Sequence, residues 1–195
     1  GCFGLTEPDF GSNPSGMITK AETLRGGGFR INGTKRWITN GDLADVAIVW
    51  AKLDGGKVRG FLVPKGTPGY STRKIDDKFS LRASVTSELF FEDCEVGEDA
   101  ILPGVVGMRG PLSCLSQARY GICFGAIGAA MSCYETALQY AKDRKQFSRP
   151  IAGYQLVQQK LVHMLSEITK AQCLTLRLGR LKESGKIKPP HISLA

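Results

Sequence analysis

The apolar positions of this chain change their spacing at about residue 105. Before that point, short apolar runs are separated by Gly and Pro, which is typical of strands joined by tight turns. After it, apolar residues recur every three or four positions, as expected for amphipathic helices. We therefore predict an α+β protein in which residues 1–104 form a β-barrel or β-sandwich domain and residues 105–195 form part of an α-helical bundle domain.

Within the first half, three apolar runs predict strands at residues 47–53, 58–64 and 88–96. An Asn-Gly pair is a strong hairpin signal, so Asn32-Gly33 predicts a turn between a strand at residues 29–31 and another at 37–38. Gly26-Gly27-Gly28 lies between two such runs and predicts another hairpin turn.

The second half predicts a long helix that ends near Arg144 and another that follows Pro150. Gly185 is the expected C-terminal cap of the second helix. A new helix is expected after Pro189-Pro190. Two long antiparallel helices cannot bury both of their apolar faces, so further helices or a partner subunit are expected against them.

Composition places the chain among ordinary globular proteins, since 42% of its residues are hydrophobic and 23% are charged. The net charge of +8 suits anionic partners, but the basic residues are scattered, and nothing indicates a nucleic-acid-binding surface. The six cysteines form no C-x-x-C pair and the two histidines stand alone, which argues against zinc and favours a reducing compartment. No apolar run approaches the roughly 18 residues of a membrane span, so none is expected.

The chain begins with Gly rather than Met, and it stops just as a helix is expected to begin. We therefore expect it to be an internal piece of a longer protein.

The usual nucleotide-binding and nucleophile motifs are missing: there is no G-x-G-x-x-G, no P-loop and no nucleophile elbow. The informative segment is the start, which reads C-F-G-L-T-E-P-D-F-G-S-N. A loop of this composition offers N–H groups and hydroxyls to a polar ring or a phosphate. By composition alone it is better described as a plain turn than as a functional loop.

Five motifs in order resemble the acyl-CoA dehydrogenase family. The starting loop resembles the family's first flavin segment, and N-G-T-K-R-W-I-T-N, at residues 32–40, resembles the second. F-S-L-R-A-S, at residues 79–84, resembles the loop before the last strand of the middle domain. D-R-K-Q-F, at residues 143–147, resembles a D/E-R-x-x-F element, and Gln155 follows at the expected offset. Within the family, residues 79–84 and 118–122 are most similar to the glutaryl-CoA dehydrogenase subfamily.

The resemblance implies FAD as the cofactor. Backbone groups of Leu5 and Thr6 and the Thr6 hydroxyl are expected at the pyrimidine edge of the flavin, Thr39 near N5, and Trp37 over the ring. Arg144, Phe147 and Gln155 are expected to contact the FAD of a neighbouring subunit. The full set of implied cofactor-binding residues is Cys2, Phe3, Gly4, Leu5, Thr6, Glu7, Pro8, Gly11, Ser12, Trp37, Ile38, Thr39, Arg144, Phe147 and Gln155.

The resemblance also implies an acyl-CoA substrate, with Arg119 and Tyr120 near its acyl end. The implied substrate-binding residues are Ser12, Leu112, Ser113, Leu115, Ser116, Arg119 and Tyr120. The family's catalytic base is a glutamate followed by Gly-Thr. No Glu-Gly-Thr occurs here, so no catalytic residue is assigned, and we predict that this chain alone is inactive.

For the longer protein, the resemblance implies dehydrogenation of an acyl-CoA, with oxidative decarboxylation of glutaryl-CoA to crotonyl-CoA favoured. An electron-transferring flavoprotein is implied as the electron acceptor and a dimer of dimers as the assembly. The implied location is the mitochondrial matrix in a eukaryote and the cytoplasm in a bacterium. Three alternatives stay open: a short-chain acyl-CoA dehydrogenase, an acyl-CoA oxidase, and a truncated, non-catalytic binding module.

Two positions depart from the family pattern. Asn13 stands where the family usually has Asp, which removes a carboxylate, and Ser148 stands where it usually has Gly. Modest local effects are expected at both.

Overall fold

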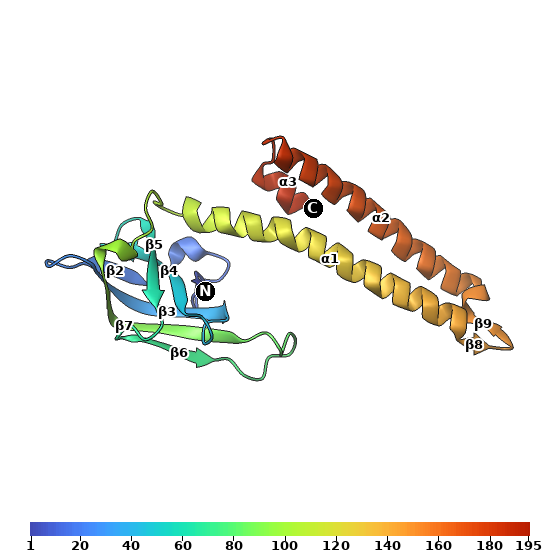
Figure 1. The fold of residues 1–195 in the computed structure, drawn as a ribbon, viewed down its shortest axis with the longest axis horizontal. Helices are drawn as coiled ribbons and strands as arrows, with labels where there is room; N and C mark the ends of the chain where they lie inside the picture. The colour runs from blue at the N-terminus through green and yellow to red at the C-terminus, as the bar shows by residue number, and fades with distance from the viewer. The chain divides into compact units, whose positions relative to one another are not determined.

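The computed structural model describes all 195 residues, in two compact units, Gly1–Ser113 and Cys114–Ala195 (Figure 1). The first unit contains the strands β1 (Cys2–Gly4), β2 (Lys20–Thr23), β3 (Phe29–Thr39), β4 (Val46–Leu53), β5 (Val58–Pro64), β6 (Tyr70–Lys74) and β7 (Thr86–Val96). The helix α1 (Arg109–Asp143) continues from the first unit into the second. The second unit also contains β8 (Lys145–Gln146), β9 (Arg149–Pro150), α2 (Gln155–Glu183) and α3 (Pro189–Leu194). The α+β organisation predicted from the sequence is confirmed.

The first unit is built on one mixed sheet of seven strands. β1 and the first two residues of β2 lie in succession along one edge of β4, both parallel to it, and β5 pairs antiparallel with the other edge. β3, β7 and β6 continue the sheet beyond β2 through antiparallel pairs. The predicted strands at residues 47–53, 58–64 and 88–96 correspond to β4, β5 and β7, whereas β1, β2 and β6 were not predicted.

The expected turn at Asn32-Gly33 is wrong, because β3 continues through both residues. The pair instead lies at an irregularity where the pairing of β3 with β7 shifts between Ile31 and Gly33. Gly33 has φ of 148°, and a Cβ at this position would lie 2.5 Å from the hydroxyl oxygen of Thr19. The glycine is therefore used for close approach within a β-bulge, which gives the same sequence signal as a hairpin turn. The turn expected at Gly26-Gly27-Gly28 is present between β2 and β3.

The core of the first unit lies where apolar side chains of six strands meet. Ile31 of β3, Val49 of β4, Phe61 of β5 and Leu89 of β7 are fully buried in it. Since strands from both halves of the sheet reach this one cluster, the sheet is curved around its core.

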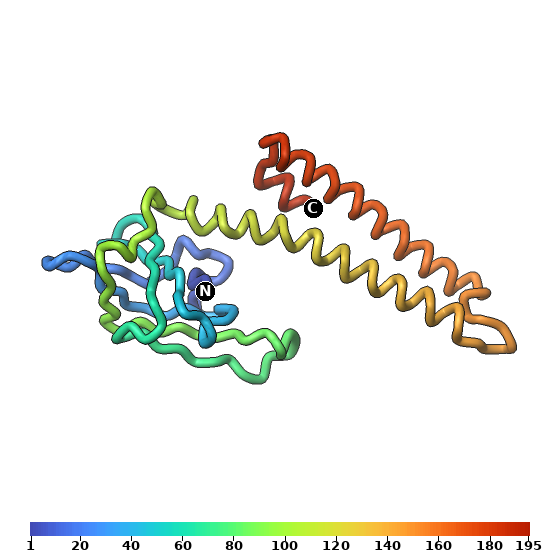
Figure 2. The backbone as a smooth tube through the Cα atoms, viewed as in Figure 1, coloured from blue at the N-terminus to red at the C-terminus, as the bar shows by residue number.

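The second unit is a helical hairpin whose two long helices run side by side (Figure 2). The end of α2 has the predicted glycine cap: Gly185 has φ of 68°, and the N–H of Lys186 donates to the carbonyl of Leu181 at 2.9 Å. α3 begins at Pro189, as expected. Many large apolar side chains of the hairpin stay exposed, among them Ile122, Phe124, Met131, Leu156, Val162, Leu165 and Leu176.

One feature of α1 differs from the sequence-based expectation. By length and composition alone this helix passes the test for a membrane span, with a mean hydropathy of 1.2 over 18 residues, none of it buried. This stretch mixes strongly apolar residues with Gly and Ser, so its mean hydropathy is high although no long apolar run forms. Core helices of soluble bundles pass the same test, so the hydropathy of α1 is weak evidence for a membrane.

Candidate functional site

Two of the predicted flavin segments lie against each other in the first unit. The backbone N–H of Arg36 donates to the carbonyl of Thr6 at 2.8 Å, and the Thr6 hydroxyl donates to the carbonyl of Arg36 at 2.5 Å. The loop that follows β1 is therefore hydrogen-bonded to the last part of β3, which carries Trp37 and Thr39. The sequence implied both segments separately, and the fold brings them together across 30 positions.

The chain bends at Trp37. The pairing of β3 with β7 shifts between Lys35 and Ile38, and Trp37 within this bulge has φ of 63°, in the left-handed region that non-glycine residues rarely adopt. Trp37 is 56% exposed, and the Arg36 guanidinium lies 5.2 Å from the centre of its ring. A large aromatic ring presented to solvent by a strained bulge is typical of a binding surface.

The opposite side of the same loop is buried. The Lys35 ammonium lies 2.9 Å from Oε1 of Glu7, and the side chains are 0% and 2% exposed. Backbone groups complete most of its contacts: Lys35 donates to the carbonyl of Leu5 at 3.1 Å, and Glu7 accepts from the N–H groups of Ile18 at 2.7 Å and Thr19 at 3.0 Å. The Lys35 ammonium also lies 4.0 Å from the Met17 sulfur.

Both members of this ion pair have shifted acidities. Burial lowers the pKa of Lys35 to about 8, against the opposing effect of the Glu7 charge. Burial alone would raise the pKa of Glu7, but hydrogen bonds from Thr19 and Ile18 and the charge of Lys35 outweigh it, so this pKa lies below its ordinary value.

The predicted positions of the two flavin segments fall into two groups, buried and accessible. The side chains of Cys2, Leu5 and Glu7 are buried, so only their backbone is available to a ligand. The backbone N–H groups of Leu5 and Thr6 make no hydrogen bond within the chain, which leaves two donors for an acceptor-rich partner. Gly4 and Ile38 are also buried. The other predicted positions are half-buried or exposed, namely Phe3, Thr6, Pro8, Gly11, Ser12, Trp37 and Thr39.

Three predicted cofactor residues lie at the β8–β9 hairpin of the second unit. Arg144 directly precedes β8, Phe147 is in the turn and 90% exposed, and Gln155 is the first residue of α2. Phe147 and Ser148 both have positive φ, of 49° and 64°, which is the conformation of a tight two-residue turn. Ser148 therefore occupies a left-handed position that suits Gly, which explains why the family usually has Gly there.

The predicted substrate positions Leu112, Ser113, Leu115, Ser116, Arg119 and Tyr120 follow one another on α1. The last two point to different surroundings. Arg119 lines a cleft between α1, α2 and α3, whereas the Tyr120 ring lies 5.1 Å from that of Phe124 and 3.9 Å from the Lys182 ammonium.

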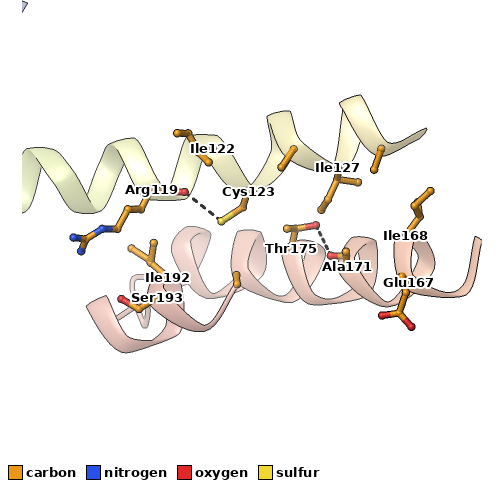
Figure 3. Close-up of a pocket in the computed structure, with 13 residues that line it drawn as sticks. Arg119, Ile122, Cys123, Ile127, Glu167, Ile168, Ala171, Thr175, Ile192 and Ser193 are labelled. Carbon is orange, nitrogen blue, oxygen red and sulfur yellow. Dashed lines mark hydrogen bonds between the residues drawn. The ribbon is translucent and has the colours of Figure 1, made fainter. Parts of the chain in front are cut away.

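The cleft of the second unit is predominantly apolar and has a volume of about 620 Å³. Figure 3 shows Arg119 at one end and Glu167 with Ile168 at the other, and Ile127 and Ile192 lie between them. Small side chains widen it: the lining also contains Cys123, Ala126, Ala130, Ala171, Thr175, Ser193 and Ala195. Except for Arg119, the cleft residues were not predicted from the sequence, because small and apolar helical residues look like ordinary bundle core.

Sequence reasoning also missed Lys35 and Arg36. A signal was present: Lys35 is two and four residues from Gly33 and Ile31, so strand periodicity places it on the buried face. A lysine predicted to be buried requires an acidic partner, and Glu7 in the first loop was available.

Comparison with known proteins agrees with this arrangement. Residues 2–94 match the model of the acyl-CoA dehydrogenase middle domain, and residues 106–195 match that of the acyl-CoA dehydrogenase C-terminal domain. The chain belongs to the acyl-CoA dehydrogenase family.

Two solved structures and one curated relative illustrate the similarity. A glutaryl-CoA dehydrogenase from Mycobacterium smegmatis is 54% identical, with a TM-score of 0.95 over 99% of this chain and 49% of that one. A second structure of a glutaryl-CoA dehydrogenase from that organism, in complex with FADH2, is 52% identical, with a TM-score of 0.95 over 99% and 50% of the two chains. The human short-chain specific acyl-CoA dehydrogenase, a mitochondrial protein, is 38% identical over 95% of this chain and 46% of its own length. The chain therefore spans about half the length of these acyl-CoA dehydrogenases.

Proposed function

We propose that this chain supplies the flavin-binding half of an FAD-dependent acyl-CoA dehydrogenase. The observation that carries the proposal is the junction of the loop after β1 with the bulge of β3. It offers two free N–H donors, at Leu5 and Thr6, beside an exposed indole at Trp37. The isoalloxazine ring has the matching chemistry, because it combines a flat aromatic face with an edge that carries several hydrogen-bond acceptors and one N–H donor. The 52% identity to a protein solved with FADH2 supports the same assignment.

FAD held at this junction would supply the acceptor for the hydride that leaves the β-carbon of the acyl group. The residues of this chain hold and orient the ring. The N–H groups of Leu5 and Thr6 bind its pyrimidine edge, and Trp37 covers it. The Thr6 hydroxyl already donates its hydrogen bond to the backbone carbonyl of Arg36, so toward the ring it can act only as an acceptor. The base that removes the α-proton is not assigned to any residue here, so we expect no turnover by these 195 residues alone.

The experiment that tests the proposal is a titration of the purified chain with FAD, followed by flavin fluorescence and absorbance. Saturable binding that quenches Trp37 fluorescence is expected. A folded chain without any FAD uptake would refute the proposal and favour the non-catalytic module. On the longer protein, reduction of an electron-transferring flavoprotein is expected, and oxygen consumption at a comparable rate would instead favour the oxidase.

For the acyl group, we propose glutaryl-CoA, which the parent would oxidise and decarboxylate to crotonyl-CoA. The similarity to glutaryl-CoA dehydrogenase supports this choice, as does Arg119 at one end of the apolar cleft, because a guanidinium pairs well with a distal carboxylate. The second candidate is a short-chain acyl-CoA, which the similarity to the human short-chain enzyme favours. The ratio of kcat/KM for glutaryl-CoA to that for butyryl-CoA in the longer protein decides between them.

We further propose an assembly as a dimer of dimers in which Arg144, Phe147 and Gln155 contact the FAD of a neighbouring subunit. The 90% exposure of Phe147 supports a partner at this hairpin. Since the human relative is mitochondrial, the matrix is the proposed location in a eukaryote, and the cytoplasm in a bacterium. Sedimentation of the longer protein with and without FAD tests the assembly.

A further inference from the structure

The buried ion pair behind the candidate flavin loop has no role in the chemistry proposed above. Lys35 and Glu7 are almost fully buried, although lysine and glutamate are among the residues least often found in that state. Two apolar side chains of similar volume commonly stabilise a fold as well as or better than such a pair. What the charged pair provides and an apolar pair lacks is directional hydrogen bonding to the neighbouring backbone.

Those hydrogen bonds connect three segments. Lys35 belongs to β3, Glu7 to the loop after β1, and the groups that Glu7 accepts from, the N–H groups of Ile18 and Thr19, belong to the segment before β2. The bond from Lys35 to the Leu5 carbonyl adds a direct link to the loop backbone. The ion pair thus holds the loop after β1 from its buried side, through hydrogen bonds to the backbone.

The link to Leu5 has a consequence on the other side of the loop. In a trans peptide unit the C=O of one residue and the N–H of the next point in opposite directions, and the chain has no cis peptide bonds. Since Lys35 holds the Leu5 carbonyl toward the core, the N–H of Thr6 must point away from it. This N–H is one of the two donors without a partner in the chain.

We propose that Lys35, held by Glu7, is a positioning residue that aims the Thr6 N–H at the flavin. This inference rests on the proposed function, because it concerns how the same loop binds its cofactor. Without the bond from Lys35, the Leu5–Thr6 peptide unit makes no hydrogen bond of its own within the chain, and the direction of the donor is less firmly fixed. Lys35 itself does not touch the cofactor.

The experiment compares FAD affinity and fold in the whole chain, using wild type, K35M, the double variant E7Q/K35M, and K20M as the matched control. Lys20 forms an ion pair with Glu22 at a similar distance, 2.8 Å, but both side chains are about half exposed. K35M keeps the length and apolar stem of the lysine and removes its charge and donors. The double variant also removes the glutamate charge, so it leaves no unpaired charge in the core.

The expected result is a weakening of FAD binding by at least about tenfold in K35M and in the double variant, consistent with loss of a charged hydrogen bond that orients the donor. Circular dichroism is expected to show a folded double variant with stability closer to wild type than that of K35M. For K20M, affinity within about twofold of wild type is expected, because exposed pairs contribute little. A purely structural role predicts instead that affinity recovers together with stability in the double variant, and that recovery would overturn the inference.

The pH profile gives an independent readout. Glu7 is the charged group that faces the Lys35 ammonium. The other contacts of this ammonium, the Leu5 carbonyl and the Met17 sulfur, are neutral. The wild-type affinity for FAD is expected to fall as pH rises through about 8, where Lys35 loses its proton, and the profile of K35M is expected to be flat there. Identical profiles in the two proteins would refute the inference. If the wild type binds no FAD, the proposed function fails and this inference fails with it; wild-type binding with an unchanged, folded K35M refutes the inference alone.

Discussion

The chain has two tryptophans, and replacing each by glycine is expected to have opposite consequences for stability and for binding. Trp50 lies in β4, is 2% exposed, and its ring packs edge-on against Phe3 at 5.9 Å. Trp37 is 56% exposed, and its backbone is in the left-handed region. The same substitution therefore tests core packing at one position and a strained binding surface at the other.

The free-energy changes follow from these environments. Removing a buried Trp side chain costs about 3–5 kcal/mol, and Gly within a strand adds roughly 0.5–1 kcal/mol. At Trp37 the change relieves about 1–2 kcal/mol of left-handed strain. This gain is offset by roughly 0.5–1 kcal/mol for glycine's flexibility and about 0.5–1 kcal/mol for the exposed contact with Arg36. We expect W50G to lose at least about 3 kcal/mol and W37G to change by less than about 1 kcal/mol.

Urea unfolding followed by far-UV circular dichroism measures both changes without relying on the indole signal. FAD titration of the same proteins completes the test: W37G is expected to stay folded and to bind FAD much more weakly than wild type. A loss of stability in W37G as large as that in W50G would refute the assignment of Trp37 to a binding surface, because it would place the indole in the core.

Three further outcomes follow from the structure. Replacing Gly69, at φ of 79°, by Ala is expected to destabilise the chain by more than about 2 kcal/mol, because the new Cβ would overlap the backbone of β7. The control for the backbone cost alone is G55A, at φ of 71° with open space around it, and equal losses of stability in urea unfolding would contradict the overlap. The pKa of Glu7 in the folded chain lies below its ordinary value of 4.5, so the Glu7 carboxylate stabilises the fold above pH 4.5 and this stabilisation is lost as pH falls through the folded pKa. The slope of unfolding free energy against pH below 4.5 should be shallower in E7Q, and an unchanged slope would argue against this contribution. Burial raises the pKa of the Cys2 thiol and raises that of Cys94 to about 11, so neither is expected to react with a disulfide reagent at neutral pH until the chain unfolds, and rapid labelling of either would contradict its burial. The exposed thiols that should react at once are those of Cys114, Cys133 and Cys173.

The sequence predicted the elements whose signal is local. The three- and four-residue spacing of apolar positions gave both long helices, and the glycine cap at Gly185 gave the end of the second. The strands β4 and β5 were predicted because a clear apolar run and a glycine turn coincide there. β1, β2 and β6 have three to five residues each, too few for a periodic pattern to emerge.

Prediction failed where one residue type serves two purposes. Asn32-Gly33 has the composition of a hairpin turn, but Gly33 is needed because the Thr19 backbone and hydroxyl come too close for a side chain. The burial of Lys35 and its partnership with Glu7 depend on a contact between positions 28 residues apart, which no local pattern contains. The two flavin segments were inferred from resemblance, whereas their mutual contact required the fold.

The contact between Thr6 and Arg36 also has a consequence for the order of folding. The loop after β1 obtains its shape only when β3 is present, and β1 itself pairs with β4, more than 40 residues away. Non-local contacts of this kind form late, after the entropy of closing the intervening chain has been overcome. A ligand at this loop would therefore recognise the completed sheet and not its precursors. Such a ligand would draw the population toward the native state in proportion to its concentration, and cofactor supply would then determine how much of the chain is folded.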